Sequence, residues 1–200
     1  MKREAEIREI FIENAISLIA EGGFEKATTK ELTHCSGNLP GLKMNEAYIY
    51  RIFGSKEKLY EATFEKLDNE LYIAFMKALE AVIGFNCNIK DKLNNLFLMC
   101  WDFILQNEVR LRCYVRFYYS AYFKGSVAEA HNKLLMGVVN QISPIFKREA
   151  DVLSILRSVF TALLDFGIRV YNGELDDNED NRKHIFNVLY CAMMTYFNGK

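Results

Sequence analysis

The stretch that decides the fold is Tyr48-Ile49-Tyr50-Arg51-Ile52-Phe53-Gly54-Ser55-Lys56-Glu57-Lys58-Leu59. Ile49 and Phe53 stand at positions i and i+4, which places both side chains on one face of a helix. Gly54 then ends that helix, because glycine readily adopts the left-handed conformation that helix ends require. Ser55 can cap a second helix, since its hydroxyl accepts a hydrogen bond from a free backbone N–H. The stretch therefore predicts a short helix, a tight break and the start of a longer helix.

Two more helices are predicted upstream. Residues 5–21 place apolar side chains at three- and four-residue steps, which is typical of an amphipathic helix. Gly22-Gly23 is expected to end this helix. Thr28 and Glu31 have the spacing of a capping box, which predicts a short second helix at about residues 29–35.

A turn at residues 37–44 separates that helix from the next one, which Asn45 is predicted to cap and which covers residues 46–52. Short helices joined by a turn are typical of helix-turn-helix DNA-binding proteins. The turn is longer here than the connection of about four residues that is usual in this motif.

The rest of the chain also predicts helices. Only two prolines, Pro40 and Pro144, occur in the sequence, and Pro144 is expected to end or kink a helix. An acidic loop at 174–180 is interpreted as a solvated connection. The sequence therefore predicts an all-α fold, with a helix-turn-helix domain at 1–54 and a larger helical domain at 55–200. The helices expected in the larger domain cover residues 55–82, 88–106, 126–143, 151–171 and 181–197.

The charge balance does not by itself indicate DNA binding. The net charge of the chain is −1, and residues 1–60 hold nine lysines and arginines against nine glutamates. Any affinity for DNA must therefore come from how these charges are separated in space.

Composition also limits the class of protein. No apolar run approaches the roughly 18 residues that a membrane-spanning helix needs, and the first residues alternate in charge, unlike a signal peptide. The five cysteines are scattered and form no C-x-x-C pair, so we expect buried, reduced thiols. The expectation is a cytoplasmic protein with no metal, no cofactor and no membrane partner.

The deciding stretch resembles the signature of the TetR family of bacterial transcriptional regulators at Tyr50, Phe53, Ser55-Lys56-Glu57 and Leu59. Upstream, Gly22-Gly23-Phe24 followed by Thr28-Thr29 is similar to the family's approach to its second helix. The resemblance covers about residues 8–67. It implies a DNA-binding head, followed by a helical domain that binds a small effector and dimerises.

The resemblance implies phosphate contacts for Tyr50 and Lys56. A recognition helix reads base edges with side chains near its start, which here are Glu46, Ala47 and Tyr48. The carboxylate of Glu46 can accept a hydrogen bond from cytosine. The predicted DNA-binding residues are Thr28, Thr29, Lys30, Lys43, Asn45, Glu46, Ala47, Tyr48, Tyr50, Arg51 and Lys56.

In the family, the last two helices form a four-helix interface with a second subunit. Here these helices carry apolar stripes, which suit either the core of the monomer or the helices of a partner. The residues predicted for the dimer interface are Leu156, Phe160, Leu163, Ile185, Leu189 and Met193.

The family also binds its effector among the helices of the second domain. Residues 108–123 are densely aromatic, and these side chains suit either an apolar pocket or ordinary core packing. A histidine or arginine could orient a polar or anionic group of the effector. The predicted pocket residues are Trp101, Phe103, Tyr114, Phe117, Tyr118, Tyr122, His131, Phe166 and Arg169.

The sequence thus predicts a homodimeric DNA-binding transcriptional regulator, a repressor that a small-molecule effector releases from a palindromic operator. A symmetric dimer reads two half-sites, whereas one recognition helix touches few base pairs. The alternative is a helical dimeric ligand- or protein-binding module that has lost specific DNA binding. An enzyme is disfavoured, because no nucleophile-and-base pattern, zinc motif or phosphate-binding glycine loop occurs.

Overall fold

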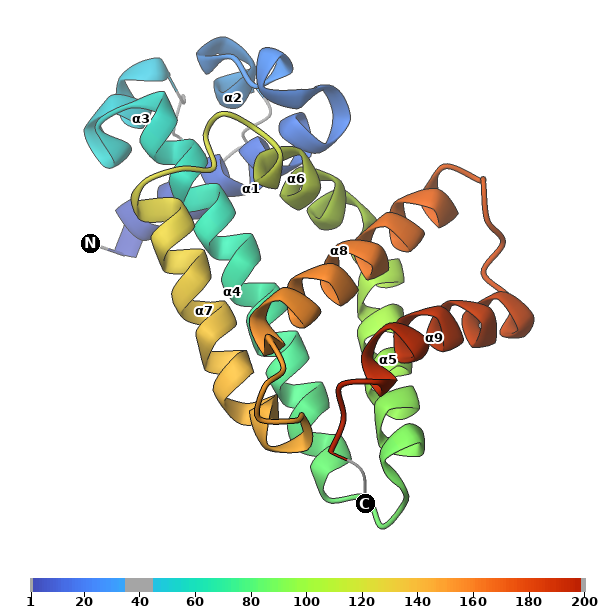
Figure 1. Ribbon diagram of the computed structural model, residues 1–200. Coiled ribbons are helices and arrows are strands. Elements are labelled where there is room, and N and C mark those ends of the chain that lie inside the picture. The colour runs from blue at the N-terminus through green and yellow to red at the C-terminus, as the bar shows by residue number, and fades with distance from the viewer. Residues whose placement is uncertain (1, 35–44, 199–200) are drawn as a thin grey trace. The chain divides into compact units, whose positions relative to one another are not determined.

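The computed structural model describes residues 2–34 and 45–198, and these residues form α-helices and one short 3₁₀ helix, without a β-sheet (Figure 1). The predicted all-α fold is confirmed. Cys35 and the predicted turn at 37–44, with Lys43, lie outside the described residues. The helices are α1 (Lys2–Lys26), α2 (Thr29–His34), α3 (Glu46–Phe53), α4 (Lys56–Ile83), α5 (Ile89–Gln106), α6 (Glu108–Tyr118), α7 (Ser126–Ile142), η1 (Ser143–Ile145), α8 (Val152–Tyr171) and α9 (Glu179–Met194).

The chain divides into two compact units. The first holds Met1–Asn69 and Val109–Ala130, and the second holds Glu70–Glu108 and His131–Lys200. The division therefore falls within α4 and α7, and each unit combines two separate segments of the chain. The predicted functional boundary after residue 54 stays a prediction.

The first unit is built on α1 to α3, whose apolar faces pack against one another. The apolar positions of α1 are buried, and Leu32 of α2 and Ile49 of α3 are fully buried as well. Gly23 (φ 75°) kinks α1 and Gly54 (φ 85°) separates α3 from α4, because both have left-handed backbones that other residues adopt only with strain. Gly54 donates its N–H to the carbonyl of Tyr50 at 2.9 Å, which closes α3.

Helix α6 adds an aromatic cluster to the first unit. Its residues Tyr114 and Phe117 are buried, and their rings stack on Phe64 of α4 with centroids 5.1 and 4.6 Å apart. Phe24, in the last turn of α1, packs edge-on against Phe117. Part of the dense aromatic run at 108–123 is therefore ordinary core packing, one of the two readings that the sequence left open.

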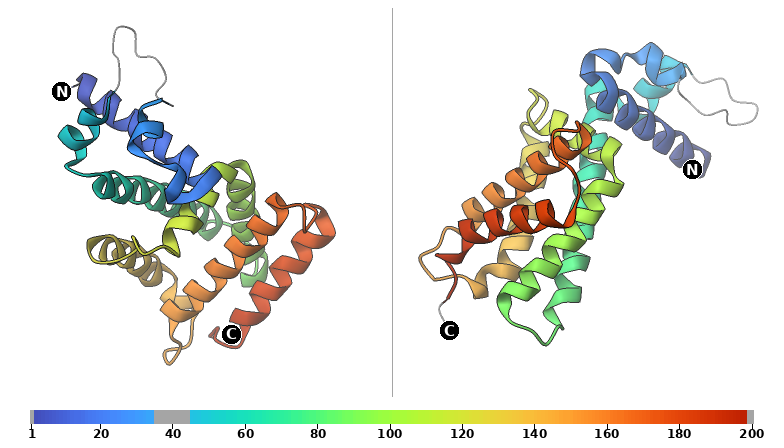
Figure 2. Two further views of the ribbon diagram at one scale, coloured as in Figure 1. Left: turned by 90° about the horizontal axis from the view of Figure 1, so that it is seen from above. Right: turned by 90° about the vertical axis from the view of Figure 1, so that its right-hand side faces the viewer.

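In the second unit, α8 and α9 lie side by side and both contact α5, as two further views also show (Figure 2). Buried side chains from these helices form the core. Pro144 lies in η1, directly after the end of α7 at Ile142, as predicted. The buried residues of α5, α8 and α9 are Phe97, Trp101, Ile104, Val152, Leu163, Leu164, Gly167, Ile185, Phe186 and Leu189.

The acidic loop before α9 is exposed, as expected of a solvated connection, and hydrogen bonds also tie it to α5. The indole of Trp101 donates a hydrogen bond to Asp177 at 3.0 Å. Arg182 binds both carboxylate oxygens of Asp177 at 2.7 Å and also donates to Asp102 of α5 at 2.9 Å. Charge-assisted bidentate pairs of this kind are among the stronger hydrogen bonds in proteins. They tie the loop and the first turn of α9 to α5.

This arrangement predicts a dependence of stability on acid. Arg182 holds the pKa of the Asp177 carboxyl below its ordinary value, and Trp101 adds to the effect. A lowered folded-state pKa contributes stability above the unfolded pKa of about 3.9, and this stability is lost as the pH falls through the folded value. The Asp177→Asn variant is therefore expected to lose less stability than the native chain between pH 6 and pH 3. Thermal unfolding across this range tests it, and parallel curves for the two chains would contradict it.

The described cysteines differ in burial. Cys113 is buried and Cys100 nearly so, and burial raises the pKa of each thiol to about 12. Cys87 and Cys191 are exposed, so the expectation of buried thiols is wrong for these two. Within the described ranges, no helix is both long and apolar enough to cross a bilayer.

Candidate nucleic-acid interface and ligand cavity

The start of α2 is capped as predicted. Thr28 accepts a hydrogen bond from the backbone N–H of Glu31 at 3.2 Å. Thr28 and Lys30 are exposed, and Thr29 is half-buried. A hydroxyl and a cation thus stand at the end of a helix whose dipole favours anions.

The start of α3 differs from the prediction in one respect. Asn45 occupies the N-cap position with an extended backbone, but its side chain makes no capping hydrogen bond. The N–H groups of the first turn therefore donate no hydrogen bond to this side chain. Glu46 and Ala47 are exposed, whereas Ile49 is fully buried, as expected for a residue of the core.

The exposed face of α3 carries two aromatic rings and a cation. Tyr50 is 54% exposed, which is high for a large aromatic side chain. The guanidinium of Arg51 lies over the ring of Tyr48, 4.3 Å from the centroid, and such cation–π contacts favour a fixed geometry. The surface therefore presents a phenol hydroxyl beside an oriented cation.

The start of α4 completes the site. Ser55 accepts a hydrogen bond from the backbone N–H of Lys58 at 3.2 Å, which confirms the predicted cap. The pKa of the Glu57 carboxyl is lowered because its own backbone N–H and the Ser55 hydroxyl donate to it. The ammonium of Lys56 lies 5.6 Å from the ring centroid of Tyr60, next to this capped end. One cation and several backbone donors thus lie at the N-terminal end of α4.

These groups suit a phosphate backbone and offer no obvious chemistry. Helix ends, hydroxyls and cations are the groups that contact DNA phosphates most often. Since α2 contacts α3, the candidate side chains of both helices belong to one packed body. Among the described residues, no cluster of His, Cys, Asp and Glu could hold a metal ion. The role of each candidate, and of Lys43 outside the described residues, stays a prediction.

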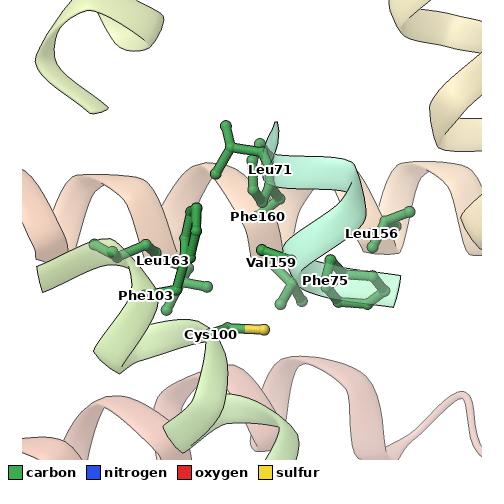
Figure 3. Close-up of a pocket in the computed structure, with 10 residues that line it drawn as sticks. Leu71, Phe75, Cys100, Phe103, Leu156, Val159, Phe160 and Leu163 are labelled. Atoms are coloured by element: carbon green, nitrogen blue, oxygen red, sulfur yellow. The ribbon is translucent and has the colours of Figure 1, made fainter. Parts of the chain in front are cut away.

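An apolar cavity lies in the second unit, between α4, α5 and α8 (Figure 3). Its volume is about 70 Å³, and a second cavity of about 120 Å³ extends it toward α7 and α9. The side chains in the close-up point toward one another across this space. The residues that line both cavities are Phe75, Cys100, Leu156, Val159 and Leu163.

The predicted pocket residues are distributed over both units. Tyr114, Phe117, Tyr118 and Tyr122 belong to the first unit and its aromatic cluster, whereas Phe103 lines the cavity of the second unit.

Four further candidates lie in the second unit but are absent from the walls of these two cavities. Trp101 and His131 are buried, and the guanidinium of Arg169 lies over Phe166 and pairs with Glu174 at 3.7 Å.

The residues predicted for the dimer interface face inward. Leu156, Phe160 and Leu163 line the cavity, and Met193 lines its extension. Ile185 and Leu189 are only 1% and 5% exposed in the single chain. Leu163, Ile185 and Leu189 therefore pack within the chain itself. Leu156, Phe160 and Met193 are half-buried, and their role in a dimer interface stays a prediction.

Sequence reasoning did not identify the cavity walls that α4 and α5 supply, namely Leu71, Phe75 and Cys100. The signal for them is weak but present. Leu71 and Phe75 are four residues apart on one stripe of α4, and Val159 continues the stripe of α8. Periodicity of this kind indicates an inward face but does not show whether space remains between the facing helices.

Known proteins resemble this chain in sequence and in fold. No family model matches the sequence. The nucleoid occlusion factor SlmA of Mannheimia succiniciproducens is 26% identical over 153 residues, which is 74% of this chain and 66% of the length of that protein.

Among solved structures, a TetR family transcription regulator from Marinobacter aquaeolei VT8 superposes with a TM-score of 0.76. Its sequence identity is 17%, and the match covers 96% of this chain and 97% of that one. A candidate TetR family regulator from Shewanella sp. PV-4 gives a TM-score of 0.73 at 18% identity, over 93% and 97% of the two chains. The resemblance that the deciding stretch predicts is thereby confirmed, and the chain has the fold of the TetR-family transcription regulators.

Proposed function

We propose that this chain is a DNA-binding transcriptional regulator, a homodimeric repressor that a small-molecule effector releases from a palindromic operator. The observation that carries this proposal is the end of α3 together with the start of α4. There the exposed phenol of Tyr50 and the cation of Lys56 flank a capped helix end. This is the arrangement that DNA phosphates select.

Helix α4 connects the proposed DNA contacts with the cavity, and this connection supports the proposed release from DNA. It begins at the capped end with Lys56, and further along it lines the cavity with Leu71 and Phe75. An effector that binds one conformation of the cavity better than another shifts the population toward that conformation. Because the same helix serves both sites, such a shift also changes affinity for DNA, and the coupling is reciprocal.

The proposed dimer uses the outward faces of α8 and α9. His184, Val188 and Cys191 form one exposed stripe of α9 at four- and three-residue steps, and Val188 is 43% exposed. Such a face suits an isologous interface, where the same patch from two copies meets.

The Val188→Glu variant is expected to shift the dimer toward monomer, because each copy would bury a carboxylate without a partner in the interface. Sedimentation velocity measures the change, and Asn187→Glu, on the neighbouring exposed position, serves as a second site. An unchanged mass for both variants would place the interface elsewhere.

A titration against DNA tests the function. Fluorescence anisotropy with the DNA upstream of the protein's own coding region, at low and moderate salt, is expected to show specific binding with dimer stoichiometry. Binding should weaken steeply as salt rises, since each neutralised phosphate releases counterions.

The second candidate function is a dimeric ligand- or protein-binding module without specific DNA binding. The equal numbers of positive and negative residues at 1–60, and the exposed carboxylate of Glu46 at the start of α3, favour it. Equal affinity for the upstream DNA and for random DNA would select this alternative.

A further inference from the structure

We infer that the cavity of the second unit binds an uncharged, chain-like apolar molecule along its length. This inference deepens the proposed function, because it names the chemical class of the effector. It rests on the chemistry of the walls, the direction of the cavity and the fixed wall at one end.

The walls contain no charged side chain among the described residues that line them. They consist of aliphatic and aromatic groups, with the sulfur atoms of Cys100 and Met193. The Cys100 thiol does not supply a charge at neutral pH, because burial raises its pKa to about 12. An ionised group placed here would lose its hydration without gaining a partner, which is strongly unfavourable. The part of a ligand that enters must therefore be neutral.

The direction of the cavity favours a linear shape. The α4 residues that line it run from Leu71 to Leu79, a rise of roughly 12 Å along the helix axis. At one end the walls are Leu71, Phe103 and Phe160. At the other end they are residues of α7, η1 and α9, including Phe146. An apolar space that extends this far along one helix suits an alkyl chain.

Two backbone hydrogen bonds between residues 145–147 and 196–198, here called the clasp, lie at the α7 and α9 end of the cavity. Lys147 donates its backbone N–H to the carbonyl of Tyr196 at 2.8 Å, and Asn198 donates to the carbonyl of Ile145 at 3.0 Å. The rings of Phe146 and Phe197 lie 5.1 Å apart across this pair of segments. Since Ile145 and Phe146 line the cavity, the clasp holds that wall in place. The cavity thus has a fixed apolar wall at this end.

Arg169, a predicted contact for an anionic group of the effector, adds no charge to the cavity walls. Arg169 pairs with Glu174 and is absent from the walls of both cavities.

The chain carries its own reporter for the test. Trp101 is the single tryptophan, and it stacks on Phe97, which lines the cavity. Its fluorescence should change when a ligand fills the space.

We propose titrating the full chain at neutral pH with decanol, decanoate and decylammonium, which share one tail and differ in charge. Decanol is expected to bind at least about tenfold more tightly than either ion. Decanoate or decylammonium binding as tightly as decanol, or no response to decanol, would overturn the inference.

Variants locate the binding site. Val159→Phe and, from the opposite wall, Ala74→Leu fill the space and are expected to weaken decanol binding at least about tenfold. Val109→Phe, at an exposed position, is the matched control and should bind normally. Circular dichroism identifies a variant that fails to fold, in which case the other filling variant decides. Folded filling variants that bind decanol like the native chain would overturn the assignment.

A parallel titration with DNA separates this inference from the proposed function. Decanol that binds the chain but leaves DNA affinity unchanged keeps the ligand class and removes the effector role. DNA binding without any decanol response keeps the regulator and removes the ligand class.

Discussion

Replacing Tyr50 and Lys56 together by alanine is expected to reduce affinity for operator DNA on the order of a hundredfold at moderate salt. Each half-site loses a hydroxyl donor and a fixed positive charge, and a dimer loses both twice. Because the contacts are to phosphates, binding to every DNA sequence should weaken alike. The slope of log affinity against log salt should also become shallower by about two, since two phosphate charges are no longer neutralised.

The matched control is the Lys77→Ala/Tyr119→Ala double variant. It removes the same two residue types, from an exposed position on α4 and from a tyrosine that is 67% exposed on the segment after α6. Lys77 lies about 30 Å along α4 from Lys56. Anisotropy titrations at several salt concentrations measure both variants. An equal loss of affinity in the two variants, or an unchanged salt slope in the first, would remove Tyr50 and Lys56 from the interface.

The helix ends of the first unit could be predicted from the sequence because local chemistry determines them. Thr28 and Ser55 accept the hydrogen bonds expected of N-caps, and Gly54 takes the left-handed backbone expected at a helix end. Gly23 takes the same backbone, but it kinks α1, which continues to Lys26. Asn45 shows the limit of this reasoning. Its position at the start of α3 was predictable, but the rotamer that decides whether its side chain bonds to the backbone was not.

The interior of the second unit could be predicted only in part. Apolar periodicity identifies the inward faces of α8 and α9, but a stripe such as Leu156 and Phe160 does not reveal which neighbour covers it. Similarly, the aromatic run at 108–123 gave no sign of which rings pack in the first unit, because that depends on contacts between segments far apart in the sequence. Asp177 was missed for the same reason, since Trp101 is 76 residues away.

The largest stability effect is expected from Tyr60→Ala in the first unit. Tyr60 is 0% exposed, and its ring packs edge-on against Phe24 and Tyr122, with centroids 5.1 and 5.3 Å apart. Its hydroxyl donates to the carbonyl of Ala27 at 2.6 Å. Removing a buried aromatic ring costs about 3–5 kcal/mol, which lowers the melting temperature by on the order of 10 °C in a chain of this size.

Two other variants divide this effect into its parts. Tyr60→Phe keeps the ring and removes the hydroxyl, so it should cost only about 1 kcal/mol. Tyr119→Ala removes an exposed ring and should change stability by less than about 0.5 kcal/mol. Differential scanning calorimetry of the three variants measures these costs, and similar costs for Tyr60→Phe and Tyr60→Ala would show that the ring packing contributes little.

Because Ala27 directly precedes the Thr28 cap of α2, the Tyr60 hydroxyl also ties α4 to the start of α2. Tyr60→Phe should therefore weaken DNA binding by more than its small loss of stability explains, if the spacing between α2 and α4 matters for recognition.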